Sequence, residues 1–494
     1  MNNSDGKIIV VSNAEPYKHE EDDEEEIVCN EVEGGLTTAM NPEMKSKGGI
    51  WIAYGRGDKD FDVVDSEGKV QVPDFPDVPD ETKYTLKRLD FPESQYRDFY
   101  RGYANRILWP ICHSFPTKAD LARENGYWSR GYLPSNKKYA RAVIAAYEPG
   151  DTVWVHDYHL ALVPRLVKNE IPEAKIGVFW HIPWAPWENF GKIPHREELI
   201  KGLVAADLIG LHLEKYVDNL LGCAEEVGAD VDRDSGRLRL DEEETQIGAY
   251  PLGVDYDFFN EVRTEGKEYL IREKYNSRHM ILGVDRQDYT KGIPERIRSF
   301  QTFIRQNPDY REEVTMVQRT PMSRTGIREY QVEKREINEE VSEFNGKFGN
   351  HDWTPINLFW RGVPQEELIA EYRAADIGLV TPGLDGMNLV AKEFIAANKE
   401  PKVLILSEFA GSSEELHEAL LVNPYDPDQV ASAIKTAIEM PEEEKQDRWR
   451  RLRKRVRKKD LPTWADEFLG DLERAHQLHS ITSYVPPEKH HQTG

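Results

Sequence analysis

Four charged residues in the C-terminal half stand where an expected strand gives way to a turn or a helix. Arg286 and Lys291 flank the turn RQDYTK, and Asp385 and Glu393 stand eight positions apart in TPGLDGMNLVAKE. Two fixed cations beside a helix N-terminus form a receptor for a diphosphate. Acceptors at both ends of a segment, with peptide N–H groups between them, suit a ligand with hydroxyls at its ends and phosphates in its middle. The spacing therefore favours a nucleotide-sugar.

The segment after Asp385 supplies the remaining groups of this predicted site. Its peptide N–H groups open a helix and are expected to bind an anion or a hydroxyl; they belong to Gly386, Met387, Asn388 and Leu389. Asp385 would accept hydrogen bonds from sugar hydroxyls. Glu393, about two turns further on, would hold a ribose diol, as acidic residues do in nucleotide-binding folds.

Each of these residues also has a purely structural explanation. Arg286 and Lys291 would serve equally as members of surface ion pairs, and Asp385 as a helix cap with Glu393 facing solvent. Position favours the binding hypothesis, because ligands of open α/β sheets bind beyond the carboxyl ends of the strands. Further polar or small residues follow predicted strands elsewhere: Asn13, Ala14, His156, Asp157, His181 and Arg324.

A metal centre is not expected. The pair of histidines in HDYH (156–159) fits zinc-ligand spacing poorly, and no H-E-x-x-H motif occurs. The three cysteines, Cys29, Cys112 and Cys223, are widely spaced. That spacing argues against a disulfide framework and favours a reducing compartment.

Strands alternate with helices along most of the chain, which predicts parallel sheets covered on both faces. One series starts at GKIIVVSN and a second near residue 278, with a break near YPLGVDYDFF. The fold class is therefore α/β, with two doubly wound Rossmann-like domains facing each other across a cleft. We expect domains at 1–253 and 254–460, a helix at 461–484 that packs back on the N-terminal domain, and a disordered tail at 485–494.

Two charged stretches have plain structural interpretations. HEEDDEEE (19–26) is expected to be a solvated loop. RWRRLRKRVRKK (448–459) resembles a nucleic-acid patch, yet Trp449, Leu452 and Val456 fall on one helical stripe. We therefore expect an amphipathic helix with a solvated basic face.

Bulk composition narrows the possible partners. The 494 residues are 39% hydrophobic and carry a net charge of −25, which disfavours nucleic acid and anionic membranes. No run is long enough to span a bilayer, and the N-terminus shows no signal-peptide pattern, so we expect a cytoplasmic protein. An acidic surface also suits a salty cytoplasm, where screening relieves self-repulsion. The oligomeric state stays open, a homo-oligomer included.

Several motifs together resemble the trehalose-6-phosphate synthase family of retaining glycosyltransferases, which have two Rossmann domains in the GT-B arrangement. They run in family order from residue 8 to about 425: VVSN, GGL, LWPICH, WVHDYHL, HIPW, DRQDYTKG, PMSR and TPGLDGMNLVAKE. The resemblance implies glucose transfer from UDP-glucose, or a GDP or ADP analogue, to glucose 6-phosphate, giving α,α-trehalose 6-phosphate. It implies no cofactor and no required metal.

The resemblance also implies roles for individual residues. Arg286 and Lys291 would neutralise the diphosphate, His181 would touch the donor sugar, and Asp157 would bind the acceptor hydroxyls. Other donor contacts would come from Gly34, Gly35, Val363, Leu368, Asp385, Gly386, Met387, Asn388, Leu389, Val390 and Glu393. Tyr100, Trp109 and Arg324 would shape the acceptor pocket, with Tyr100 and Arg324 on its phosphate. The C-terminal domain would bind the nucleotide-sugar, where Arg319 could reach the base, and the N-terminal domain would bind the acceptor.

One departure from the family pattern bears on the acceptor. The family has arginine after VSN, and this chain has Ala14, followed by an acidic run. A missing charge-assisted hydrogen bond costs roughly 1.5–3 kcal/mol. Lys18, Arg56, Arg101 or Arg106 could compensate. Alternatively, the acceptor is glycerol phosphate, another polyol phosphate or an unphosphorylated sugar, or the chain is a regulatory homologue that binds ligand without turnover.

Overall fold

The structure is a computed structural model that describes residues 6–22, 24–32, 35–75, 79–275, 277–324 and 326–482. The chain forms two compact units. The first comprises the described residues of Met1–Ile111, Asp120–Tyr250 and Ala465–Gly494, and the second comprises those of Cys112–Ala119 and Pro251–Trp464. The predicted disordered tail, 485–494, lies outside the described residues.

The first unit is built on a ten-stranded sheet whose seven central strands are parallel. Its order is β10 (Asp230–Asp232), β11 (Arg237–Leu240), β12 (Glu243–Ala249), β9 (Leu208–Leu211), β8 (Lys175–Phe179), β7 (Thr152–His156), β1 (Ile8–Val11), β4 (Ile50–Tyr54), β6 (Tyr84–Leu89) and β5 (Lys69–Val72). Antiparallel pairing occurs only at the two edges, in β10–β11–β12 and β5–β6. The central strands are short apolar runs that are buried on both faces.

Helical segments connect these strands, several of them in succession between one strand and the next. They are α1 (Gly35–Lys47), α2 (Glu93–Tyr96), the π-helical segments η2 (Arg97–Leu108) and η5 (Trp128–Tyr132), α3 (Trp109–Cys112), α4 (Glu124–Tyr127), α5 (Leu133–Ala146), α6 (Val163–Lys168), α7 (Trp187–Phe190), α8 (Arg196–Val204) and α9 (Glu214–Glu226). The last helix, α18 (Leu461–Thr482), joins this unit from Ala465 onward. There Phe468 stacks on Trp154 at 5.1 Å and covers Gly177 and Gly210, two strand residues without side chains.

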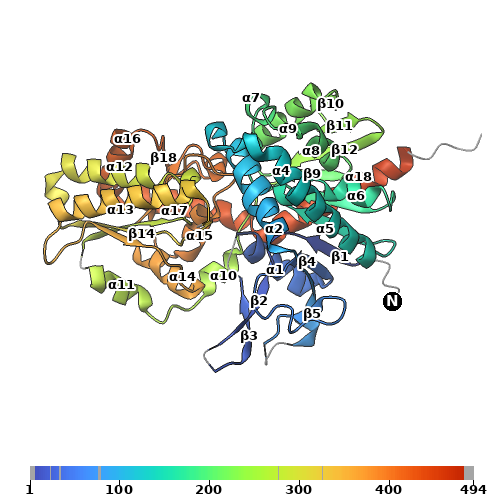
Figure 1. The fold of residues 1–494 in the computed structure, drawn as a ribbon. Coiled ribbons are helices and arrows are strands. Elements are labelled where there is room, and N and C mark those ends of the chain that lie inside the picture. The colour runs from blue at the N-terminus through green and yellow to red at the C-terminus, as the bar shows by residue number, and fades with distance from the viewer. Residues whose placement is uncertain are drawn as a thin grey trace, which may run out of the picture. The chain divides into compact units, whose positions relative to one another are not determined.

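The second unit has a six-stranded, wholly parallel sheet with helices on both faces (Figure 1). Its order is β15 (Ile356–Phe359), β14 (Val314–Arg319), β13 (His279–Val284), β16 (Ile377–Val380), β17 (Val403–Ser407) and β18 (Leu420–Val422). One face packs on α12 (Ile293–Gln306), α13 (Arg328–Phe348) and α16 (Pro427–Glu439). The other packs on α10 (Tyr256–Glu261), α14 (Gln365–Ala374), α15 (Leu389–Ala397) and α17 (Glu442–Lys458), with α11 (Lys267–Tyr275) against α14. The predicted α/β class with two Rossmann-like units is confirmed.

The structure tests the predictions for the two charged stretches, 19–26 and 448–459. α17 buries Trp449, Leu452 and Val456 and exposes its basic residues, as the helical stripe indicated. The solvated-loop prediction for 19–26 is right only in part. Residues 22 and 24–26 form an exposed turn, but residues 19–21 belong to β2 (Tyr17–Glu21), which pairs antiparallel with β3 (Ile27–Glu31). Tyr17 and His19 of β2 are buried, and the charge count concealed this short alternation. Within the described residues, no helix is both long and apolar enough to cross a membrane.

Candidate active site

The cations Arg286 and Lys291 lie in the loop that carries β13 into α12. Asp288 caps the short turn Tyr289–Lys291, and Gly292, at φ +60°, opens α12. The Lys291 ammonium pairs with the Asp385 carboxylate, and Asn388 donates to the same Asp385 oxygen at 3.0 Å. Burial would raise the pKa of Asp385, but the Lys291 charge lowers it below its ordinary value. The structure thus brings together residues that stand about a hundred positions apart in the sequence.

Asp288 contacts both Arg286 and Arg324, the other predicted cation of this unit. Its buried carboxylate lies 3.7 Å from the Arg286 guanidinium and 3.1 Å from that of Arg324, and Tyr330 Oη donates to it at 3.1 Å. Arg286 keeps 44% of its side chain exposed, whereas Arg324 keeps 6%. Arg286 is therefore the more available of the two for an anionic ligand, and the orientation of Arg324 is fixed by Asp288 and Tyr330.

The loop 385–388 is held by a second loop that sequence reasoning missed. Asp385 forms an isolated parallel bridge with Ala410, Gly411 N–H donates to the Asp385 carbonyl at 3.1 Å, and Ser412 N–H donates to the Met387 carbonyl at 2.8 Å. A Cβ atom at Gly411 would collide with the Gly386 carbonyl oxygen. Asn388, in the left-handed region at φ +65°, then caps α15 by accepting from Ala391 N–H at 3.3 Å. These backbone contacts fix the loop at which the first N–H groups of α15 lie.

Glu393 lies one turn into α15, where Tyr372 Oη donates to its carboxylate at 2.8 Å. Burial raises the pKa of Glu393 to about 7, although the tyrosine hydrogen bond lowers it slightly. Leu389 and Val390 at the start of the helix are partly buried against the core, as is Leu368 of α14. Val363, in the loop after β15, is half-buried. Their predicted donor contacts stay predictions.

Two buried arginines shape this half-site in ways that the sequence did not indicate. Arg296 in α12 is fully buried and joins two strand ends through Asp285 (2.5 Å) and Thr381 (2.9 Å), and it also donates to the Lys291 carbonyl (3.3 Å). Arg319 was expected in a loop where it could reach a base. It is instead the last residue of β14, and its guanidinium donates to Glu371.

In the first unit, Asp157 directly follows β7 with φ +75°, a strained value for a residue other than glycine. Its carboxylate accepts from Tyr158 N–H at 3.0 Å and lies 3.5 Å from His159 Nδ1. Burial would raise the pKa of Asp157, but His159 and His181 hold it at about 2. An ionised carboxylate at a strand end can accept hydrogen bonds from sugar hydroxyls.

His181 follows β8 and belongs to a buried group of imidazoles. Its Nε2 atom lies 3.0 Å from His156 Nδ1, and His212 Nε2 lies 3.1 Å from the His181 carbonyl oxygen. Burial lowers the pKa of His181 to about 4 and that of His156 further below its ordinary value. Both rings are therefore neutral near pH 7, which leaves His181 as a hydrogen-bonding group without a charge.

Tyr100 and Trp109 lie on and just after η2. Tyr100 stacks between Tyr96 (5.4 Å) and His159 (5.6 Å), and Tyr96 stacks on Tyr54 at 3.8 Å. Trp109 is buried, 6.0 Å from the Tyr158 ring. Asn13 Nδ2 lies 3.3 Å from the Tyr96 hydroxyl. The predicted Tyr100 and Asp157 are thus joined through His159, in a row of rings that extends to Tyr54.

Sequence reasoning missed Tyr54, Tyr96 and His159. The strand-end rule would have found Tyr54, the last residue of β4. Of the glycines predicted to meet the donor phosphates, Gly35 is the first residue of α1 and Gly34 lies outside the described residues. The predicted residues therefore fall into two half-sites, one in each unit. Across the described parts of the chain, no group of three or more His, Cys, Asp or Glu side chains could hold a metal ion.

Comparison with known proteins shows what the chain as a whole is similar to. Residues 6–474 match the model described as glycosyltransferase family 20. A trehalose-6-phosphate synthase of Sinorhizobium fredii is 35% identical over 89% of this chain and 94% of its own length. A bifunctional trehalose-6-phosphate synthase/phosphatase of Thermoproteus tenax is also 35% identical, over 94% of this chain, which spans 63% of that relative's length.

Solved structures give the same picture. A UDP-forming α,α-trehalose-phosphate synthase from Burkholderia xenovorans in complex with glucose-6-phosphate shares 30% identity, with a TM-score of 0.83 over 95% of this chain and all of that one. A protein from E. coli bound with UDP-2-fluoro glucose shares 27% identity, with a TM-score of 0.83 over 95% of this chain and 99% of that one. The likeness covers both units.

Proposed function

Because the chain belongs to glycosyltransferase family 20, we propose that it transfers glucose from a nucleotide-glucose, in first place UDP-glucose, to glucose 6-phosphate. The product is α,α-trehalose 6-phosphate. The proposal is supported by relatives that are trehalose-6-phosphate synthases and by solved neighbours bound with UDP-2-fluoro glucose or with glucose-6-phosphate.

The observation that carries the proposal is the cluster of Arg286, Lys291 and Asp385 at the strand ends of the second unit. The Lys291 ammonium has three donors, so it can hold Asp385 and a diphosphate oxygen together. Arg286 adds a second, more exposed cation. Asp385 then accepts hydrogen bonds from hydroxyls of the transferred glucose. The first N–H groups of α15, which follow the same loop, bind this glucose as well.

Glycosyl transfer passes through an oxocarbenium-like state while the nucleoside diphosphate leaves. Arg286 and Lys291 stabilise the charge that develops on the leaving oxygen, and because they are already in place they do so without reorganisation. No carboxylate of the half-sites serves as a covalent nucleophile. The departing phosphate oxygen takes the proton of the acceptor hydroxyl on the same face of the sugar, so the configuration is retained. In this mechanism Arg286 and Lys291 stabilise the leaving group, so no divalent metal is required.

The acceptor half-site belongs to the first unit. Asp157, ionised at neutral pH, orients the acceptor hydroxyls, and neutral His181 contacts the donor sugar near the reacting carbon. Tyr100 and Trp109 shape the pocket around the acceptor ring. Arg324 of the second unit, oriented by Asp288 and Tyr330, binds the acceptor phosphate.

The test is a matrix of nucleotide-glucose donors against acceptors, read as released nucleoside diphosphate and product mass. We expect UDP release and trehalose 6-phosphate with UDP-glucose and glucose 6-phosphate. Arg286→Met and Lys291→Met should each lower kcat/KM by about 100- to 1000-fold. Arg278→Met, on an exposed arginine whose ion pair among the described residues is with Glu313, is the matched control and should leave kcat/KM unchanged. Undiminished turnover in both site variants would contradict the proposed mechanism.

Ala14 favours a second candidate function, in which the same donor chemistry serves glycerol phosphate, another polyol phosphate or an unphosphorylated sugar. Ala14 follows β1 next to Asn13 and brings no charge to this strand end. The acceptor arm of the matrix separates the two candidates. Ala14→Arg should lower the KM for glucose 6-phosphate sharply if that sugar phosphate is the true acceptor. Binding of UDP-glucose without release of UDP with any acceptor would indicate a regulatory homologue.

A further inference from the structure

Few cations of the first unit are available to an anionic acceptor near Ala14. Lys18 pairs with Glu20 at 2.7 Å, and Arg106 is engaged with Asp120 and the Tyr127 hydroxyl. Arg88 is fully buried in an ion pair with Glu15. Within the described residues, the exposed guanidinium groups of Arg56 and Arg101 make no hydrogen bond or ion pair. These two are the candidates.

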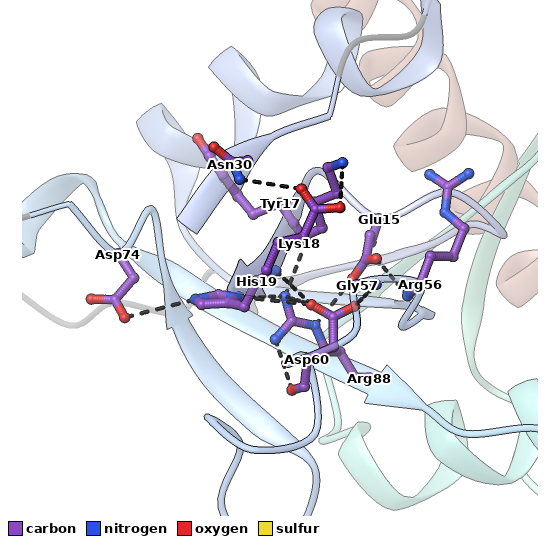
Figure 2. A network of polar contacts seen from close by, with 11 residues as sticks. Glu15, Tyr17, Lys18, His19, Asn30, Arg56, Gly57, Asp60, Asp74 and Arg88 are labelled. Atoms are coloured by element: carbon purple, nitrogen blue, oxygen red, sulfur yellow. Dashed lines mark hydrogen bonds and ion pairs between the residues drawn. The ribbon is translucent and has the colours of Figure 1, made fainter. Parts of the chain in front are cut away.

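Arg56 is distinguished from Arg101 by what holds its backbone. The Glu15 carboxylate, next in sequence to Ala14, accepts Arg56 N–H at 2.7 Å and Arg88 Nε–H at 3.0 Å (Figure 2). Figure 2 also shows the Arg56 side chain directed away from this network. Ala14 and Arg56 are thus neighbours in space, although 42 positions apart in the sequence.

The loop that carries Arg56 is fixed at its other end as well. Asp60 accepts N–H groups from Gly57 at 2.6 Å and from His19 at 2.7 Å, and it pairs with Arg88 at 2.9 Å. A Cβ atom at Gly57 would collide with the His19 carbonyl oxygen, so the loop packs directly on the β2 backbone. Glu15, Arg88 and Asp60 have fully buried side chains. A buried, ion-paired base therefore holds a loop that presents an exposed cation.

The surroundings of Arg56 are those of the acceptor half-site. Burial raises the pKa of Tyr54 and of Tyr96, and the Arg56 charge opposes that rise at both phenols, which places the guanidinium close to them. Tyr96 in turn stacks on Tyr100. Asn13 is 5% exposed, and its Oδ1 atom is buried without a hydrogen-bond partner among the described residues. This acceptor is therefore open to a hydroxyl donor at the strand end.

We propose that Arg56 binds the phosphate group of the acceptor sugar phosphate, in the place of the charge that Ala14 lacks, and that Glu15 is the positioning residue that holds Arg56 there. The inference rests on the proposed function and adds, to the role proposed for Arg324, a group of the first unit that recognises the acceptor's anion. Asn13 Oδ1 accepts from a hydroxyl of the same acceptor.

The first test compares Arg56→Ala with the unaltered chain, using UDP-glucose and glucose 6-phosphate. Loss of a charge-assisted hydrogen bond should raise the KM for glucose 6-phosphate by about 10- to 100-fold, with kcat changed much less. The KM for UDP-glucose should stay the same, because only the acceptor loses a contact. Arg141→Ala, on an exposed arginine of α5, is the matched control and should behave as the unaltered chain.

Rescue and positioning give independent readouts. Ala14→Arg added to Arg56→Ala should restore the KM for glucose 6-phosphate, since it returns a cation to the neighbouring position. Glu15→Gln should raise that KM severalfold with a smaller effect on kcat, provided that its thermal unfolding stays cooperative. An unchanged KM in Arg56→Ala, or a rise of equal size in Arg101→Ala alone, would overturn the proposal.

Calorimetric titration with glucose 6-phosphate, with glucose and with glycerol 3-phosphate separates this inference from the proposed function. If glucose 6-phosphate is not a substrate, the proposed function fails. The Arg56 inference still stands if a phosphate ester binds the unaltered chain and binds Arg56→Ala about 10- to 100-fold more weakly. It fails if no phosphate ester binds, or if glucose loses as much affinity as glucose 6-phosphate does.

Discussion

Asp385 and Glu393, eight positions apart in one segment, are both buried, yet their pKa values shift in opposite directions. Asp385 has the Lys291 ammonium beside it, and its pKa falls below the ordinary value. Glu393 has only the Tyr372 hydroxyl, and burial raises its pKa to about 7. The first carboxylate is therefore permanently charged at neutral pH, while the second titrates in the working range of most enzymes.

Donor binding should consequently depend on pH through Glu393. An ionised carboxylate accepts both hydroxyls of a ribose diol more strongly than a protonated one does. The Kd for UDP should therefore fall by about threefold to tenfold as the pH rises from 6 to 8. Titration calorimetry at both pH values measures it.

Glu393→Gln is the control for this pH dependence, since the amide keeps the shape and cannot ionise. Its remaining pH dependence reports the ionisation of the UDP phosphate itself. If the variant and the unaltered chain show equal slopes, Glu393 does not hold the ribose in a charge-dependent way.

At the scale of elements, the proposed donor half-site is built on two loops that contact each other. The loop 385–388 precedes α15, and the loop around Gly411 follows β17 and accepts no side chain where it crosses Gly386. The contact is between backbones, so it fixes the N–H groups of α15 independently of the side chains that touch the ligand.

Gly411→Ala should therefore weaken donor binding although residue 411 carries no functional group. The added methyl group forces the backbone at Gly386 to move, and we expect the Kd for UDP to rise by about tenfold or more, with a loss of stability of about 1–3 kcal/mol. Gly346→Ala is the matched control. Gly346 lies exposed in α13 with open space around it, so alanine there should stabilise the helix by about 0.5–1 kcal/mol.

Titration with UDP and thermal unfolding measure both variants. Equal UDP affinity in Gly411→Ala and the unaltered chain would show that the contact between the two loops does not position the donor site.

The elements that were predictable from sequence are those with strong periodicity. Arg286, Lys291 and Asp385 could be placed together because parallel strands end at one edge of a sheet, and the α17 stripe was visible as Trp449 and its partners. The supports were not predictable. Arg296, Gly411 and Glu15 act through buried partners far away in the sequence, and a single sequence gives no sign of such pairings. The hairpin at 17–31 was missed because its charges obscured a two-residue alternation.

For the whole molecule, two buried carboxyl groups link stability to pH. Burial raises the pKa of Glu333 to about 8 and that of Glu393 to about 7, from an ordinary value of 4.5. The folded chain therefore keeps protons that the unfolded chain releases as the pH rises from 4.5 to 8. Stability is greatest below that window and falls through it, by about 1–2 kcal/mol per carboxyl between pH 6 and 8.

Calorimetric melting at pH 6 and pH 8 measures this loss, which should appear as a lower Tm at the higher pH. Glu333→Gln should flatten the dependence, because the amide removes one of the linked protons and leaves the buried position filled. A Tm that rises between pH 6 and pH 8 would mean that these carboxyls are ionised in the folded chain.

Every edge strand of the two large sheets is short: β10 and β18 have three residues each, and β5 and β15 have four. An exposed edge is a template on which another chain can add a strand, and repulsion between acidic surfaces normally discourages such pairing. Salt screens this repulsion but does not change the length of the edge strands. Copies of this acidic chain should therefore not pair through their sheet edges even in concentrated salt, because the edge strands remain short when the charges are screened.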